Sequence, residues 1–401
     1  MTLSLSPRMS VIAASATATA MARAAAAKAA GRPVISLTTG EPDFDTPGHI
    51  QDAAIAAMRA GQTRYTAVDG TPELKRAVAE KFRRENGIDY TVDEVCVGTG
   101  AKQVIFNAVL AVIGDGDEAV IPAPSWVSYP DMVKLAGGAP VMLDCGPEAA
   151  FKPTAKQIAG KITDRTRLII LNSPCNPTGA VLSAQELQAI GEVVRGRPDI
   201  LVICDDIYEH LTYGAEFATL AQVCSDLKGQ VLTVNGVSKA FAMTGWRIGY
   251  GGGPAELIRA MRVLQSQSTT NPCSVAQAAA VAALDGGLET VRAQTAAFAR
   301  RRETLLARLR GMNGVTVQAP DGAFYLFIGI AGLLGRTSGG RVALSDEDAV
   351  VSTLLDEANL GVVGGAGFGM SPYFRISFAA SDEILAEAMD RLEAFLAAIS
   401  G

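Results

Sequence analysis

Residues 231–250 read VLTVNGVSKAFAMTGWRIGY, and the fold is organised around this stretch. The apolar run from Val231 to Val234 predicts a short buried strand, and the Asn-Gly pair behind it predicts a turn. Ser238 and Lys239 follow at once, and Arg247 lies eight residues beyond the lysine, before a second short apolar run. This layout predicts that one amine and one guanidinium face a shared pocket at the end of a strand.

These two residue types suit a ligand that carries an aldehyde and a phosphate. A lysine that is partly desolvated at a strand end loses its proton near neutral pH and condenses with an aldehyde. An arginine nearby suits a phosphate. The two groups together describe pyridoxal 5'-phosphate, so the rest of the chain is expected to supply the other contacts of such a cofactor.

Composition sets the class of protein. The 401 residues are long enough for two domains, and 49% apolar with 19% charged residues is ordinary for a globular chain. The net charge of -6 argues against nucleic acid and membrane surfaces as partners. No apolar run approaches the roughly 20 residues of a membrane span. The expected partners are small molecules and other subunits.

The cysteines and histidines carry no metal signature. The six cysteines lack Cys-x-x-Cys spacing, so we interpret them as reduced core residues of a protein in a reducing, cytoplasmic compartment. They are Cys96, Cys145, Cys175, Cys204, Cys224 and Cys273. The two histidines, His49 and His210, lie far apart near turn signals. No metal site and no Ser-His-Asp triad is therefore predicted.

The N-terminal region resembles a targeting peptide in composition, because residues 10–30 are rich in alanine and lack acidic side chains. It has no long apolar centre, however. Residues 17–30 predict a helix that ends at Gly31 and Pro33, and residues 1–14 predict an N-terminal arm.

Short apolar runs alternate with helical stretches through the middle of the chain. This pattern predicts an α/β fold with a mostly parallel seven-stranded sheet covered by helices on both faces. The predicted strands are residues 95–97, 119–121, 141–143, 168–171, 200–204, 231–234 and 248–250. Ligands of such sheets bind beyond the carboxyl ends of the strands.

The two ends of the chain predict a second, smaller α+β domain. A long helix from about residue 288 to 309 leads into it, and a helix at residues 381–399 closes it. Its predicted strands are residues 315–317, 323–327, 362–363 and 374–378. We assign residues 48–288 to the large cofactor-binding domain, and residues 15–47 and 289–401 to the small domain.

Several polar or aromatic residues directly follow the predicted strands. Gly100 opens a helix whose backbone N–H groups suit an anion, although tight packing explains a lone Gly-x-Gly about as well. Trp126 is suited to stacking on a pyridine ring, and Asp205 to pairing with its N–H. Tyr208 and Asn176 are suited to donating to a phenolic oxygen. Taken singly, these residues are explained as core packing, a helix N-cap or a turn; taken together, they favour the cofactor.

In their order along the chain, these residues make a family recognisable. The motifs that carry the resemblance are Ser15-Ala16-Thr17, Gly40 to Phe44, Tyr65, Asn172 to Gly179, Asp205 to His210, Ser238 to Gly249, Gly322 to Tyr325 and Phe374 to Ser377. The chain resembles, nearly end to end, the class I and II aminotransferases of fold type I. Within them it is similar to the bacterial aspartate aminotransferase subgroup, which includes aspartate/prephenate enzymes.

The resemblance implies roles for the cofactor contacts. Lys239 would be the Schiff-base lysine, Asp205 the partner of the pyridine nitrogen, and Tyr208 a donor to the ring oxygen; these three are the predicted catalytic residues. Tyr65 would reach the phosphate in the neighbouring subunit of a homodimer. The full predicted set of cofactor contacts is Tyr65, Gly100, Ala101, Lys102, Trp126, Asn176, Asp205, Tyr208, Ser238, Lys239 and Arg247.

The substrate contacts rest on fewer residues. Arg375 stands on a predicted strand of the small domain, where its guanidinium suits the α-carboxylate of an amino acid. Lys102 is a cation in the first turn of a helix, which the helix dipole disfavours, and this misfit favours a functional role. The resemblance implies that Lys102, Ser15 and Thr17 recognise a distal carboxylate. The predicted substrate contacts are Ser15, Thr17, Gly40, Lys102, Trp126, Asn176 and Arg375.

Three positions depart from the family pattern. Cys175 stands where relatives often have Asn or Ser, and Asp206 where many have Glu. Gly236 replaces a serine that binds phosphate in other subgroups, so Ser238, Arg247 and backbone groups are expected to carry more of the phosphate contact.

The implied activity is ping-pong transfer of the amino group from L-aspartate to 2-oxoglutarate, with Lys239 as the proton carrier. Prephenate or an aromatic 2-oxo acid is an alternative acceptor. A different pyridoxal reaction, such as β-elimination, and a non-catalytic ligand-binding role are further alternatives.

Overall fold

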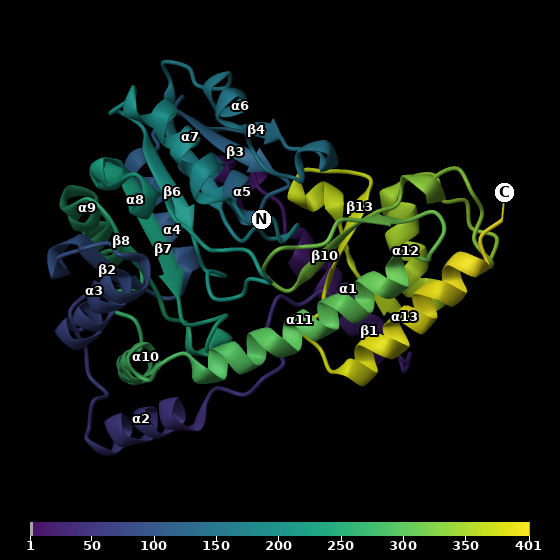
Figure 1. The fold of residues 1–401 in the computed structure, drawn as a ribbon, viewed down its shortest axis with the longest axis horizontal. Coiled ribbons are helices and arrows are strands. Elements are labelled where there is room, and N and C mark those ends of the chain that lie inside the picture. The colour runs from purple at the N-terminus through teal and green to yellow at the C-terminus, as the bar shows by residue number, and fades with distance from the viewer. Residues whose placement is uncertain (1–2, 401) are drawn as a thin grey trace.

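The apolar runs at the centre of the chain form the predicted seven-stranded sheet, in the order β2-β8-β7-β6-β5-β3-β4 (Figure 1). β8 runs antiparallel to both of its neighbours, and the other strands share one direction, which confirms the mostly parallel sheet. The strands are β2 (Val95–Gly98), β3 (Glu118–Ala123), β4 (Ala139–Asp144), β5 (Thr166–Asn172), β6 (Leu201–Asp205), β7 (Val231–Gly236) and β8 (Gly249–Gly252).

The computed structural model describes residues 3–400. Residues 1 and 2 of the predicted arm, and residue 401 of the predicted small domain, lie outside this range. Within it, no helix combines the length and the apolar character that crossing a bilayer requires.

Helices cover both faces of the large sheet, and alternate residues of each central strand point to opposite faces. In β5, Leu168 and Ile170 pack in one cluster with α4 and α9, whereas Ile169 and Leu171 pack in another with α3 and α7. Burial on both faces explains why these strands read as continuous apolar runs. The helices are α2 (Gly48–Arg59), α3 (Pro72–Asn86), α4 (Ala101–Val112), α5 (Ser128–Leu135), α6 (Ala155–Ala159), α7 (Ala184–Arg195), α8 (Leu220–Val223), α9 (Ala255–Ser266) and α10 (Ser274–Asp285).

The two ends of the chain build a second cluster of elements. Figure 1 shows α11 (Glu289–Leu309) leaving the region of α10 and running beside α13 (Asp382–Ala397). A four-stranded antiparallel sheet has the order β12-β13-β10-β9, and β1 pairs with β11 in parallel. The remaining elements are α1 (Ala16–Ala29), β1 (Ile35–Ser36), β9 (Thr316–Val317), β10 (Tyr325–Gly329), α12 (Glu347–Ala358), β11 (Leu360–Gly361), β12 (Val363–Gly364) and β13 (Tyr373–Ser377).

The structure corrects two expectations. Sequence reasoning placed no helix where α12 lies, although Asp346 caps it by accepting a hydrogen bond from the Ala349 N–H at 2.8 Å. Cys273 is exposed, so the interpretation of all six cysteines as core residues is wrong for this one; the other five are buried. It directly precedes α10, at the surface. The predicted domain boundaries at residues 48 and 289 coincide with the starts of α2 and α11 and stay predictions.

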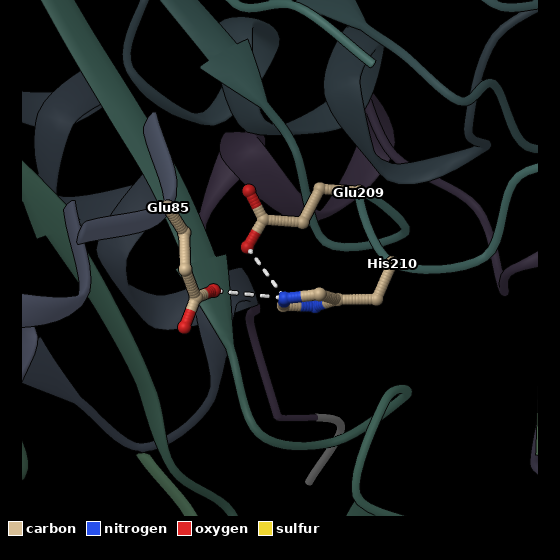
Figure 2. Close-up of side chains that lie close together, drawn as sticks. All are labelled: Glu85, Glu209 and His210. Carbon is tan, nitrogen blue, oxygen red and sulfur yellow. Dashed lines mark hydrogen bonds and ion pairs between the residues drawn. The ribbon is translucent and has the colours of Figure 1, made fainter. Parts of the chain in front are cut away.

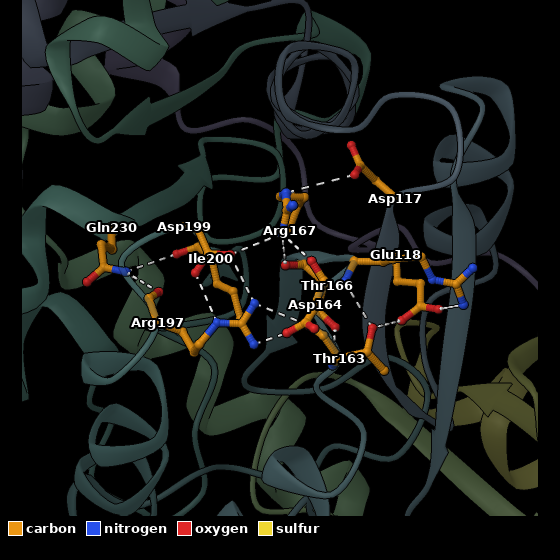
Figure 3. A network of polar contacts seen from close by, with 11 residues as sticks. Asp117, Glu118, Thr163, Asp164, Thr166, Arg167, Arg197, Asp199, Ile200 and Gln230 are labelled. Carbon is orange, nitrogen blue, oxygen red and sulfur yellow. Dashed lines mark hydrogen bonds and ion pairs between the residues drawn. The ribbon is translucent and has the colours of Figure 1, made fainter.

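A polar network holds the amino ends of the central strands (Figure 3). Arg167 at the start of β5 pairs with Asp199 at 3.0 Å and with Asp117 at 3.8 Å. The Thr163 hydroxyl donates to Glu118 at 2.6 Å. These groups pair with one another at the edge of the sheet that a parallel fold does not use for ligands.

Close approach of backbones fixes the opposite edge. A Cβ on Gly249 would overlap Ala101 N and Gly100 C, so only glycine lets β8 lie against the start of α4. Gly100, at φ +83°, caps α4 and lies against the Arg247 guanidinium. The fold therefore sets a helix N-terminus beside an arginine.

Candidate functional site

The carboxyl ends of β5, β6 and β7 open onto a cavity of about 370 Å³. Residues from α1, from the loop after β1, and from β10 and β13 close its other side. Most of the predicted site residues line it, namely Ser15, Thr17, Gly40, Ala101, Lys102, Trp126, Asn176, Asp205, Tyr208, Ser238, Lys239, Arg247 and Arg375. Gly100 lies directly beside it, against Arg247.

Tyr65 is the predicted residue that the structure leaves outside this cavity. Its side chain is 91% exposed and borders a different surface hollow. Sequence reasoning assigned it to the site of a neighbouring subunit, and that assignment stays a prediction.

Lys239 follows β7, and its Nζ donates to the Gly40 carbonyl oxygen at 2.6 Å. Desolvation of the ammonium group, helped by the positive charge of Arg247, lowers the pKa of Lys239 to about 8. At mildly alkaline pH a far larger fraction of this amine is unprotonated than of an ordinary lysine, and the unprotonated form acts as a nucleophile.

Asp205 ends β6 as a buried carboxylate beside the cavity. Burial raises the pKa of Asp205 to about 6, against the opposing effect of a 2.6 Å hydrogen bond donated by the Tyr129 hydroxyl. A buried carboxylate calls for a cationic or N–H partner. A pyridine nitrogen in the cavity meets that need.

Arg375 of β13 is a buried guanidinium whose recorded polar partners are uncharged. It donates to Asn176 Oδ1 at 2.9 Å and to the Thr38 carbonyl oxygen at 2.6 Å, and its Nε has no partner among the described residues. Burial lowers the pKa of Arg375, yet an arginine stays charged in proteins. The site therefore offers a cation ready for a carboxylate.

Lys102 projects from the first turn of α4, with its Nζ 4.6 Å from the centre of the Trp126 ring. Partial burial, together with the charge of Arg247, lowers the pKa of Lys102. Ser15 is the N-cap residue of α1 and Thr17 lies in its first turn, and both line the same cavity. These three polar groups come from the starts of α1 and α4, whereas Arg375 comes from β13, so the cavity offers polar groups for a second carboxylate besides Arg375.

The residues present fit pyridoxal 5'-phosphate. Ser238, the start of α4 and Arg247 lie together and would form a cradle for its phosphate. Asp205 suits the ring nitrogen, and the hydroxyl of Tyr208 suits the ring oxygen. Lys239 would supply the amine for the aldehyde.

Sequence reasoning missed two tyrosines of this cavity. Tyr129 contacts Asp205 as described, and Tyr325 makes a 2.8 Å hydrogen bond between its hydroxyl and that of Tyr208. Tyr129 follows Trp126 by three residues, and Tyr325 is the last residue of the motif Gly322 to Tyr325. Their closeness in sequence to predicted site residues and motifs was the signal that could have identified them. Their hydroxyl partners lie 76 and 117 residues away along the chain, where local patterns carry no information.

One acidic and histidine cluster lies outside the cavity (Figure 2). Glu85, Glu209 and His210 bring their ligand atoms within 4.8 Å of one another, and His210 Nε2 lies 2.9 Å from Glu85. Lys81, however, pairs with Glu209 directly and with Glu85 at 3.6 Å. The ammonium group supplies the cation that these carboxylates need. We therefore interpret the cluster as an ion-pair network that ties α3 to the segment after β6.

Comparisons with known proteins agree with this geometry. The sequence model of the family "Aminotransferase class I and II" matches residues 32–392. An aspartate/prephenate aminotransferase of Cereibacter sphaeroides is 52% identical over 397 residues, which cover 99% of each chain. An aspartate aminotransferase of Rhizobium meliloti is 50% identical over 389 residues, covering 96% of this chain and 95% of the relative.

Two solved structures are similar to this one. The crystal structure of an aspartate aminotransferase from Rhizobium meliloti superposes with a TM-score of 0.97 at 47% identity, over 100% of both chains. A Thermus thermophilus aspartate aminotransferase with maleate superposes with a TM-score of 0.91 at 41% identity, over 98% of this chain and 100% of that one.

The lowered pKa of Lys239 gives a pH prediction. The unprotonated amine of Lys239 is the nucleophile. The rate at which cofactor-free protein forms a Schiff base with pyridoxal should therefore rise with pH and level off above about 8. The reactivity of an ordinary lysine would continue to rise above this pH. Pyridoxal without phosphate keeps the phosphate cradle out of the measurement. The absorbance of the bound aldehyde reports the rate.

The variant Arg247→Met serves as the comparison. Loss of the neighbouring positive charge should move the midpoint of the rate profile to higher pH. A wild-type midpoint near the ordinary lysine value of 10.5 would contradict the assigned environment of Lys239.

Proposed function

The chain belongs to the class I and II aminotransferase family and is a pyridoxal phosphate-dependent enzyme, and on this basis we propose that it transfers the amino group of L-aspartate to 2-oxoglutarate. The products are oxaloacetate and L-glutamate. The observation that carries the proposal is that two cationic side chains from different elements, Arg375 of β13 and Lys102 of α4, line one cavity. A dicarboxylic amino acid needs both.

The chain's own residues divide the work. When bound, the cofactor supplies an aldehyde for the amino group and a ring that takes up electrons. Asp205 would keep a negative charge at the ring nitrogen, and Tyr208 would donate to the ring oxygen. Lys239 Nζ, with its pKa near the working pH, would take the proton from the substrate Cα and later return one.

Substrate recognition rests on charge. Arg375 would bind the α-carboxylate through its free donors, while Asn176 holds the guanidinium in place. Lys102, with Ser15 and Thr17, would bind the distal carboxylate. The similar Thermus thermophilus structure contains maleate, a four-carbon dicarboxylate of the length of aspartate, which supports a dicarboxylic substrate.

Prephenate is a second candidate acceptor. The relative from Cereibacter sphaeroides, named for both activities, is 52% identical to this chain. Prephenate carries a carboxylate besides that of its 2-oxo acid group, so the same two cationic groups serve it. The names of these relatives give no support to β-elimination or to a non-catalytic role.

We also propose a C2 homodimer. Apolar side chains of the first 65 residues stand exposed on the single chain, as expected of a surface that a partner covers. They are Leu3, Leu5, Met9, Val11, Met21, Ile55, Met58 and Tyr65. Tyr65 would complete the phosphate contacts of the neighbouring subunit. A cytoplasmic location fits the free cysteines.

The direct test of the activity uses purified enzyme with L-aspartate and 2-oxoglutarate. We expect glutamate and oxaloacetate to appear in equal amounts. The Lys239→Ala variant should retain bound cofactor without its covalent absorbance and should lose at least about a thousand-fold in kcat, because the proton carrier is gone. Absence of glutamate with every dicarboxylic donor would refute the proposal.

The role of Lys102 predicts a change in selectivity. Lys102→Ala should lower kcat/KM for aspartate by about 10- to 100-fold, the value of one hydrogen bond to a charged group, and should change kcat/KM for alanine little. Lys134→Ala is the matched control, because Lys134 pairs with Asp131 at 3.1 Å on the surface of α5. Equal losses for aspartate and alanine would show that Lys102 does not read the distal carboxylate.

The shared site predicts complementation between two inactive proteins. In a hybrid of Lys239→Ala and Tyr65→Ala subunits, one site receives an intact Lys239 and an intact Tyr65, and the other receives neither. The isolated hybrid should therefore recover about half of the wild-type activity. Activity no greater than that of the two parent proteins would place Tyr65 outside the partner's site.

A further inference from the structure

Tyr325 lies between Tyr208, which is assigned to the cofactor, and Arg375, which is assigned to the substrate. It begins β10, pairs with Ser377 of β13, and is 1% exposed although it lines the cavity. The proposed transamination gives its side chain no role so far.

The phenol touches groups from both halves of the site. Its hydroxyl lies 2.8 Å from the hydroxyl of Tyr208, on the cofactor side. Its ring centre lies 4.4 Å from the guanidinium carbon of Arg375, on the substrate side. A Cβ on Gly40 would overlap the Tyr325 hydroxyl, so the glycine leaves space for it. The Gly40 carbonyl oxygen in turn accepts the hydrogen bond from Lys239 at 2.6 Å.

Proton counting fixes the direction of the tyrosine pair once an anionic oxygen is present. Burial raises the pKa of both phenols, so each carries a single hydroxyl proton at working pH. If Tyr208 donates its proton to a ring oxygen in the cavity, it has none left for Tyr325. Tyr325 must then be the donor in the bond between the two hydroxyls. Two such bonds in series strengthen one another.

We propose that Tyr325 is a positioning residue, whose hydroxyl donates to Tyr208 and so directs the Tyr208 proton toward the ring oxygen of the cofactor, while its ring supports the Arg375 guanidinium. This inference rests on the proposed function and deepens it. It links the residue that binds the α-carboxylate to the residue that tunes the cofactor through one rigid side chain.

The test is a spectroscopic titration of the holoenzyme without substrate. Tyr325→Phe keeps the ring and removes the hydroxyl, which weakens donation by Tyr208 to the anionic form of the ring oxygen. The pH midpoint of the absorbance change of the covalently bound cofactor should therefore rise by about half a unit. Tyr213→Phe is the matched control, because the Tyr213 hydroxyl is bonded to the Ala323 carbonyl oxygen outside the cavity. It should leave the midpoint unchanged.

A double-variant cycle separates positioning from general loosening of the fold. In a Tyr208→Phe background, Tyr325→Phe should no longer shift the midpoint, because the group through which it acts is absent. No shift in the single variant, or an equal shift in both backgrounds, would overturn the proposal. KM for aspartate should change less than about two-fold in Tyr325→Phe, because the ring under Arg375 remains.

The titration needs no substrate, so its result is independent of which amino acid the enzyme accepts. A normal shift with no aspartate turnover would leave Tyr325 assigned and refute the substrate proposal. Turnover of aspartate with no shift of the midpoint in Tyr325→Phe would support the substrate proposal and refute the role of Tyr325.

Discussion

An imbalance of charge organises the site. Four cationic side chains, those of Lys102, Lys239, Arg247 and Arg375, line a cavity in which Asp205 is the carboxylate among the described lining residues. In a low-dielectric enclosure such an excess is costly unless anions enter. A phosphate and two carboxylates are suitable anions, so the same charges that burden the empty fold favour its cofactor and a dicarboxylic substrate.

The surrounding structure fixes the elements that carry these charges. The close contact of Gly249 in β8 with Gly100 and Ala101 fixes the start of α4 beside β8, where the phosphate of the cofactor would bind. The ion pairs of Lys81 with Glu85 and Glu209 tie α3 to the segment that begins with Asp205. The charges of this network pair with one another. The positive charges that a ligand must neutralise are therefore those in the cavity.

Sequence reasoning reached the sheet and the strand-end residues because both follow from local patterns. Asp205 and Lys239 directly follow buried apolar runs, and a parallel sheet brings such positions to one edge. The hydroxyl contacts of Tyr129 and Tyr325 were out of reach, because an aromatic residue among apolar neighbours reads as core until its distant partner is known. α12 was missed for a related reason, since its burial depends on packing against β11 and α13.

The direction of β8 shortens the connection between two residues of the site. Because β8 is antiparallel to β7, its first residue lies at the cofactor edge, and the connection from Lys239 to Arg247 needs only seven intervening residues instead of a crossover helix. Lys239 and Arg247, the proposed covalent and phosphate contacts, therefore lie on one short connection between two paired strands. Of the proposed substrate contacts, Ser15 and Thr17 lie at the start of α1 and Arg375 lies in β13, at opposite ends of the chain, whereas Lys102 lies in α4. Changes at the two ends of the chain would therefore alter part of the proposed substrate site without changing the segment from Lys239 to Arg247.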